Sequence, residues 1–259
     1  WCVIVNATLM SAACFKVVSN QPITQLGPLM DSLTQPFNPL KVLSFDLETT
    51  SANPFEARIV TSALVRIDSG GAHPQELLAD PGVPIPEAAT KVHGITTEYA
   101  REHGRPHADV LAETITAIRK AWTDGYTLIV YNASYDLTVL HSLEPGFLIT
   151  GPVYDPYVMD KLLDPYRRGK RTLTALCEEY QVRLENAHEA TSDALAAARI
   201  AWKQAKKRFA SQISPQTMEQ LMEFQAVGYY RSQNDFKKYL LGRGKDASDV
   251  NTAWPLQTP

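Results

Sequence analysis

The sequence has little cysteine, no long apolar run and no strong overall charge. Its three cysteines, Cys2, Cys14 and Cys177, are far apart and form no CxxC pair, which argues against a zinc site or a disulfide framework. A reducing, cytoplasmic location fits this pattern. The apolar start, "WCVIVNATLMSAACFKVVS", lacks a basic region and is too short and interrupted to span a bilayer. We therefore expect no membrane partner.

The charge is small in total but uneven along the chain. The formal net charge of −3 gives no overall sign of a polyanionic partner. Residues 203–245, however, hold nine lysines and arginines and only three acids. A basic region beside an acidic body suits an anionic polymer, and a solvated helix face explains the same charges. The sequence leaves both interpretations open.

Length and proline content predict three parts. A chain of 259 residues can hold one sizeable domain and an extension. Residues 1–40 are expected to form an N-terminal arm, since 20–40 contain four prolines. The chain begins with Trp1, and Met30 is the candidate natural start. Residues 41–210 are expected to form the main domain, and residues 211–259 a basic, helical C-terminal extension.

Hydrophobic periodicity predicts an α/β domain with a mixed sheet of about five strands. Strands are expected at 41–48, 58–68, 73–81 and 126–133 and after Gly151, and helices at 108–125, 134–143, 171–182 and 191–210. A meander followed by alternating strands and helices favours a mixed sheet flanked by helices. The chain after residue 210 reads as helical up to Gly242.

Four acids and one histidine occupy places where these elements begin or end. Asp46 and Glu48 point to the same face of the first strand, because strand side chains repeat with a period of two. Asp136 opens the helix after the buried strand, and Asp193 lies early in a later helix, five residues after His188. An acid at a helix start is more often a cap. Together, carboxylates without cysteine favour hard cations such as Mg²⁺ or Mn²⁺.

The segments that carry these residues resemble motifs of the DnaQ-like 3′–5′ exonucleases, the superfamily of the proofreading subunit of bacterial DNA polymerase III. They are "FDLETT" (45–50), "NASYDLTVL" (132–140) and "HEATSDALAAARI" (188–200), and "KVHGITTEYA" (91–100) matches a segment found between the first two motifs. The resemblance spans about 41–205 and implies a ribonuclease H-like fold. The H-x4-D spacing is similar to the histidine (DEDDh) subclass, and the tail resembles extensions of actinobacterial members.

The resemblance implies a metal-dependent exonuclease that releases 5′-mononucleotides from DNA 3′ ends. Two divalent cations, Mg²⁺ with Mn²⁺ as a substitute, would be held by the four acids, with His188 as general base. The expected partner is single-stranded or frayed DNA with a free 3′ end. The family also implies contacts to the terminal nucleotide, for which the candidates are Thr49, Val92, His93, Asn132 and Tyr135.

Several alternatives stay open from the sequence. An RNA-directed 3′–5′ exoribonuclease of the same family would carry the same motifs, and so would a non-catalytic nucleic-acid-binding or polymerase-associated module that had kept them. "QTMEQLMEF" (216–224) invites comparison with sliding-clamp peptides, but its spacing favours a packed helix face formed by Met218, Leu221, Met222 and Gln225. The basic segment 167–171 suits phosphate or a solvated loop equally well.

Overall fold

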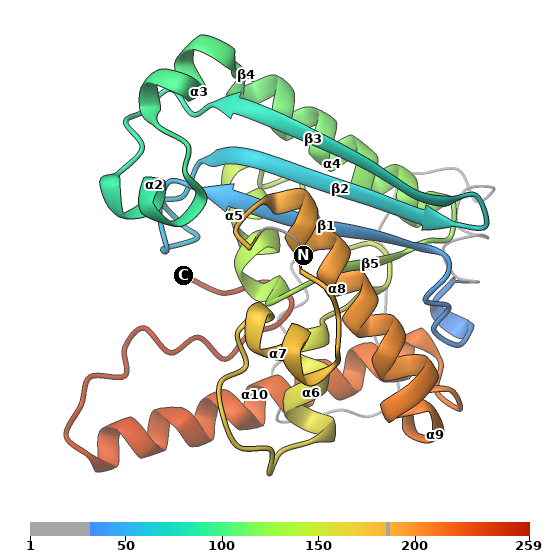
Figure 1. Cartoon of the computed structure of the whole chain (residues 1–259). Coiled ribbons are helices and arrows are strands. Elements are labelled where there is room, and N and C mark those ends of the chain that lie inside the picture. Colours follow the sequence, from blue (N-terminus) through green and yellow to red (C-terminus); the bar gives the residue numbers. More distant parts are fainter. Residues whose placement is uncertain (1–31, 185–186) are drawn as a thin grey trace.

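The computed structural model describes residues 32–184 and 187–259 (Figure 1). The expectations for residues 1–31, including Met30 as the natural start, lie outside the described residues. Among the described residues, no helix combines the length and apolar character needed to cross a membrane.

A mixed sheet with the strand order β4-β3-β2-β1-β5-β6 forms the centre of the molecule. Strands β1 (Val42–Thr49), β2 (Ile59–Asp68) and β3 (Gly71–Asp80) make the expected antiparallel meander. On its other side β1 pairs in parallel with β5 (Thr127–Val130), which pairs with β6 (Val153–Tyr154). The predicted mixed sheet is confirmed. The predicted number of about five strands omits β4 (Arg105–Pro106), which has only two residues and therefore shows no hydrophobic period.

Helices cover both faces of this sheet, with α8 in front and α4 behind in Figure 1. The first half contributes α2 (Glu87–His93), α3 (Thr97–His103), α4 (His107–Thr123) and α5 (Ala133–Leu143). The second half contributes α6 (Pro156–Leu163), α7 (Leu173–Glu179), α8 (Ala190–Lys203), α9 (Ala210–Ile213) and α10 (Met218–Gly242). The predicted end of the last helix at Gly242 is confirmed.

The long helix predicted over 191–210 is interrupted. A π-helical turn, η2 (Gln204–Arg208), follows α8 and separates it from α9. The cause lies at Gln204, whose side chain is fully buried. Its amide oxygen accepts a hydrogen bond from the Tyr154 hydroxyl at 3.0 Å, and its amide nitrogen donates to the Pro156 carbonyl at 2.9 Å. The helix therefore widens where a polar side chain must reach β6 and α6.

The C-terminal region packs into the same core as the sheet. Met218, Leu221, Gln225 and Tyr229 form the buried face of α10, which confirms the packed-face interpretation of residues 216–224 and leaves that face no room for a clamp. Phe37, from the expected arm, stacks on a core tyrosine of β6 with ring centroids 4.3 Å apart. The domain boundaries after residues 40 and 210 stay predictions.

Candidate active site

The C-terminal end of β1 carries the first two acids. Asp46 and Glu48 both lie on the face of the sheet that α8 covers, and both are partly buried. Ser44, two residues before Asp46, is fully buried, and its hydroxyl donates to the Ala194 carbonyl at 2.6 Å. This bond joins β1 to the first turn of α8, where Asp193 lies. The register of β1 against β2 shifts between Glu48 and Thr49, as strands often do beside active sites.

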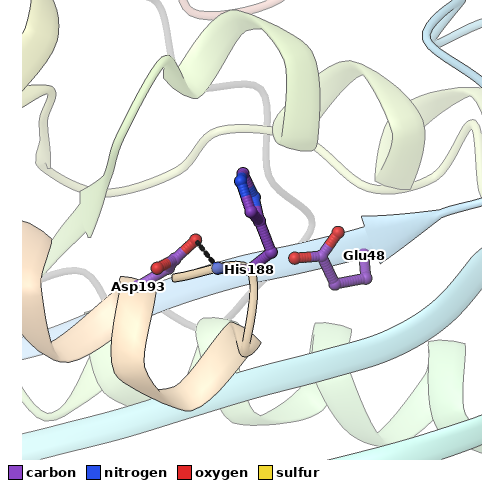
Figure 2. Close-up of side chains that lie close together, drawn as sticks. All are labelled: Glu48, His188 and Asp193. Carbon is purple, nitrogen blue, oxygen red and sulfur yellow. Dashed lines mark hydrogen bonds between the residues drawn. The ribbon is translucent and has the colours of Figure 1, made fainter. Parts of the chain in front are cut away.

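Figure 2 shows the imidazole of His188 between the carboxylates of Glu48 and Asp193. One ligand atom from each of the three side chains lies within 4.8 Å of the other two. His188 is exposed, and its backbone, at φ 66°, is in the left-handed region. Its backbone N–H donates to Asp193 Oδ2 at 3.3 Å. The turn before α8 is thus shaped to place this ring beside the acids.

Asp136 reaches the same place from the other side of β1. Strand β5 ends at Val130, which pairs with Phe45, so β1 continues past the end of its parallel neighbour. The buried Asp136 carboxylate fills this position and accepts the backbone N–H of Leu47 at 3.1 Å. The first turn of α5 is thereby fixed to β1 between Asp46 and Glu48.

Burial raises the pKa of all four acids. Burial is the largest cause of the raised pKa of Asp46, followed by the charges of Asp136, Asp193 and Glu48. Burial also raises the pKa of Asp136, against a lowering by the Leu47 N–H. The pKa of Glu48 rises to about 7, from burial and then Asp193, and the pKa of Asp193 rises to about 6, mainly from burial. Four such anions repel one another until a cation neutralises them.

The donors of this cluster suit a hard divalent cation. They are carboxylate oxygens with one imidazole and no thiolate, the set that Mg²⁺ or Mn²⁺ accepts. Asp193 Oδ1 is buried and has no hydrogen-bond partner among the described residues. A buried carboxylate oxygen without a donor is costly unless a cation meets it. The predicted acid and histidine residues therefore come together with donors left over for a metal.

Three of the five nucleotide-contact candidates also meet beside Glu48. The hydroxyl groups of Thr49 and Tyr135 are hydrogen-bonded to each other, and both contact the carbonyl of Ser51. Burial raises the pKa of the Tyr135 phenol to about 12, so it stays protonated as a donor. Burial lowers the pKa of His93, against a smaller rise from a hydrogen bond with the Thr49 backbone, which places His93 beside this strand end.

The other two candidates are more isolated. Val92 is exposed near the end of α2, and its neighbour His93 reaches β1 instead. Asn132 is exposed, with φ 62°, directly before α5. Val92 is next to His93 in the sequence, and Asn132 is next to Ala133, so both lie at the border of the cluster. A contact of either side chain with a nucleotide stays a prediction.

Sequence reasoning missed Asp155, which is fully buried directly before α6. Its carboxylate accepts the backbone N–H groups of Asn132 at 3.1 Å and Ala133 at 2.8 Å, so it holds the start of α5. An aspartate between a strand and Pro156 reads as an ordinary helix cap, which it also is. Only its contacts across the sheet distinguish it.

Two of the four basic residues in segment 167–171 are turned inward. Arg167 and Arg171 form ion pairs with the buried Asp160, the former at 3.1 Å. Arg171 also donates to the carbonyls of Asp160 and Asp164. Two of its basic residues therefore stabilise the loop between α6 and α7, and only Arg168 and Lys170 are exposed.

The architecture matches solved exonucleases. Exonuclease I of E. coli, solved in complex with a dT13 oligonucleotide, superposes with a TM-score of 0.55 at 19% identity, over 76% of this chain and 45% of that one. A second exonuclease I structure gives a TM-score of 0.56 at 20% identity, over 66% of this chain and 42% of that one. At these identities the likeness shows a shared fold, the ribonuclease H-like fold.

Sequence comparison then identifies the family. The exonuclease (RNase_T) family model matches residues 43–201, so the chain belongs to this exonuclease family, and the predicted DnaQ-like resemblance is confirmed. A DNA polymerase III subunit epsilon-like protein of Rhodobacter capsulatus is 36% identical over 132 residues, 49% of this chain and 18% of that protein. A PolC-type DNA polymerase III of Pediococcus pentosaceus is 24% identical over 201 residues, 74% of this chain. The chain spans only 13% of the length of that polymerase.

Proposed function

We propose that this chain is a metal-dependent 3′–5′ exonuclease that releases 5′-mononucleotides from DNA 3′ ends. The observation that carries the proposal is the meeting of Glu48, His188 and Asp193 within 4.8 Å, beside Asp46 and Asp136. Five residues from one strand end, two helix starts and the turn before α8 converge there, each with chemistry that phosphodiester hydrolysis uses. Membership in an exonuclease family supports the same conclusion.

The four acids are proposed to hold two divalent cations, Mg²⁺ or Mn²⁺. Glu48 and Asp193, which have ligand atoms within 4.8 Å of His188, would hold one ion together with Asp46, and Asp136, fixed to Leu47, would hold the second together with Asp46. When bound, such a pair supplies an activated water and stabilises the charge that develops on the attacking and leaving oxygens. The raised pKa values of the acids and the unpartnered Asp193 Oδ1 support this assignment.

His188 is proposed to act as the general base. Its exposed imidazole takes the proton of the attacking water, whose oxygen forms the new bond to phosphorus. The bond from phosphorus to the 3′ oxygen of the preceding nucleotide breaks, and that oxygen takes up a proton as the shortened strand leaves. Thr49, His93 and Tyr135, with Val92 and Asn132 at the border, are proposed to hold the terminal nucleotide.

Single-stranded or frayed DNA is the proposed substrate. One relative is named a DNA polymerase and the other a DNA polymerase subunit epsilon-like protein, and one exonuclease I structure holds a dT13 oligonucleotide, all of which support DNA. The same names support an association with a polymerase, which copurification would test. The motifs are the same in enzymes that act on DNA and on RNA, so RNA ends are the competing substrate and a test must include them.

The test is a digestion of matched 5′-labelled oligonucleotides in Mg²⁺. We expect single-stranded DNA to shorten from its 3′ end one nucleotide at a time, faster than duplex DNA and faster than RNA of the same sequence. Asp46→Asn should remove this activity, because it takes away a carboxylate that no neighbour replaces. If RNA is digested faster than DNA of the same sequence, the protein is an exoribonuclease instead. No cleavage of any substrate by the unaltered protein would favour a binding module.

A further inference from the structure

The C-terminal tail after α10 returns to the helix that carries Asp136. Trp254 is buried, and its indole Nε1 donates to Asp155 Oδ2 at 3.4 Å. Three residues later, the backbone N–H of Gln257 donates to Thr138 Oγ1 at 2.8 Å. Figure 1 shows the tail leaving the far end of α10 and running back toward the main body. Thr138 lies on α5, which carries Asp136, and Asp155 accepts hydrogen bonds from the backbone that opens α5.

Asp155 connects the tail to the start of α5. Besides the indole of Trp254, the same carboxylate accepts the backbone N–H groups of Asn132 and Ala133, which open α5, and of Tyr157 in α6. It is fully buried, so each of these donors satisfies an acceptor that water cannot reach. We expect that removal of one donor shifts the Asp155 carboxylate and weakens its hydrogen bonds to the backbone that opens α5.

Helix α10 reinforces the same place. The side-chain oxygen of Gln225 accepts the backbone N–H of Asp155 at 2.7 Å, and its nitrogen donates to the Val153 carbonyl at 3.1 Å. The hydroxyl of Tyr229 is hydrogen-bonded to Ser134 Oγ at 3.2 Å. All of these groups are buried or nearly so. The region after residue 210 thus contacts α5 directly and through Asp155.

These contacts hold α5 from the face opposite to its acid. Ser134 and Thr138 are four residues apart and therefore share one face of the helix. Asp136 lies midway between them in sequence, so it points the other way, toward β1 and the Leu47 N–H. A hydrogen-bonded path consequently runs from Trp254 through Asp155 and the start of α5 to Asp136.

We propose that Trp254, acting through Asp155, is a positioning residue for Asp136, and that the tail and α10 form part of the active-site scaffold. The proposal rests on the proposed function, because that function supplies the cation that Asp136 would hold. The effect of the tail on the order of α5 can be measured without any cation. A change in the tail would accordingly alter the start of α5, and with it the position of Asp136 and of its neighbours Asn132 and Tyr135.

The test uses Trp254→Phe in the full chain, because phenylalanine keeps the aromatic packing and removes the indole donor. We expect amide hydrogen exchange at Asn132, Ala133 and Leu47 to accelerate about 3- to 10-fold, the effect of losing one buried hydrogen bond. Calorimetric titration with Mn²⁺ should show one of the two proposed ions binding about 10- to 100-fold less tightly. The kcat for DNA should fall. Trp202→Phe is the matched control. Trp202 lies in the last turn of α8, at the other end of this helix from Asp193, and its replacement should change none of these quantities.

Two results would overturn the proposal. One is exchange at Leu47 and Ala133 that matches the unaltered protein, and the other is faster exchange with unchanged Mn²⁺ binding. Tyr229→Phe, which removes the contact to Ser134, gives an independent check on the same amides. A further outcome is that the unaltered protein binds Mn²⁺ and cleaves nothing while Trp254→Phe still accelerates exchange and weakens Mn²⁺ binding. In that case the proposed function fails and the positioning role stands.

Discussion

At the scale of single residues, the acids of the cluster cost the metal-free protein stability. The pKa of Glu48 rises from 4.5 to about 7 and that of Asp193 from 3.8 to about 6, with burial the largest cause for both. Each carboxyl therefore holds its proton more tightly in the folded chain than in the unfolded chain. The protonated carboxyl groups are compatible with the metal-free fold, and the carboxylate forms are the ones that bind a cation.

This difference predicts a falling stability with rising pH in metal-free buffer. Between about pH 4 and pH 7 the folded chain binds more protons at these two groups, so the free energy of unfolding decreases as the pH rises. Urea denaturation in EDTA at pH 5 and pH 7.5 measures the effect. Glu48→Gln should flatten the dependence, because an amide does not titrate. An equal slope in the variant and the unaltered protein would show that Glu48 does not contribute.

Replacement of His188 separates proton transfer from cation binding. The residue has φ 66°, which asparagine also adopts readily, so His188→Asn should keep the turn before α8. We expect kcat to fall about 10²- to 10⁴-fold, the usual contribution of a general base. Stabilisation by Mg²⁺ in thermal unfolding should remain, because the carboxylates are intact. Loss of that stabilisation would instead make His188 a metal ligand.

At the scale of elements, the site depends on how closely α8 approaches β1. The face of α8 toward the sheet is lined with alanines, and Ala194, Ala197 and Ala201 are buried. Small side chains let the helix lie near the strand, where Ser44 donates to the Ala194 carbonyl. Asp46 and Asp193 flank this bond along the chain, so the contact of the two elements sets the spacing of the acids.

Removal of that bond should weaken the fold measurably. Ser44→Ala leaves the packing nearly unchanged and deletes a fully buried hydroxyl donor. We expect the free energy of unfolding to drop by about 1 kcal/mol, the typical net value of one hydrogen bond. Chemical denaturation measures the change, with the exposed Ser211→Ala expected to stay within about 0.5 kcal/mol. Equal effects of the two changes would exclude a role of this bond.

At the scale of the whole molecule, cation binding and folding are linked. The acid cluster joins β1, α5 and α8, and the unfolded chain has no such cluster. Mg²⁺ at about 100 times its dissociation constant should therefore stabilise the fold by about 2.7 kcal/mol. Thermal unfolding with Mg²⁺ and with EDTA measures the shift, and Asp46→Asn should show a much smaller one. A similar shift in both proteins would place the bound ions elsewhere.

The local sequence predicted the parts of this molecule that carry a period or a motif. The acids of β1, the helix start at Asp136 and the pair His188 and Asp193 were all visible as residues at element ends. Three short elements, α2, α3 and β4, were not predicted, because too few residues repeat in them for a period to emerge. The equally short α7 and β6 were predicted, as the helix over 171–182 and the strand after Gly151.

Contacts between distant segments were equally invisible. Asp155 bonds to an indole 99 residues later, and Gln204 reaches a tyrosine 50 residues earlier. Nothing in the neighbouring sequence signals either partner, because each bond depends on the completed packing of the sheet and α10. The inward turn of Arg167 toward Asp160 likewise required the loop's own conformation.

The return of the tail to α5 has a consequence for biosynthesis. The ribosome delivers β1, α5 and α8 first, and Trp254 and Gln257 emerge only after α10 has been made. Domains fold as they are synthesised, from the N-terminal side onward. During that interval α5 lacks two of its anchors, so the growing chain carries all its acids before it can hold them in their final arrangement. The nascent chain therefore reaches the described geometry of α5 only after Trp254 and Gln257 have cleared the ribosomal tunnel.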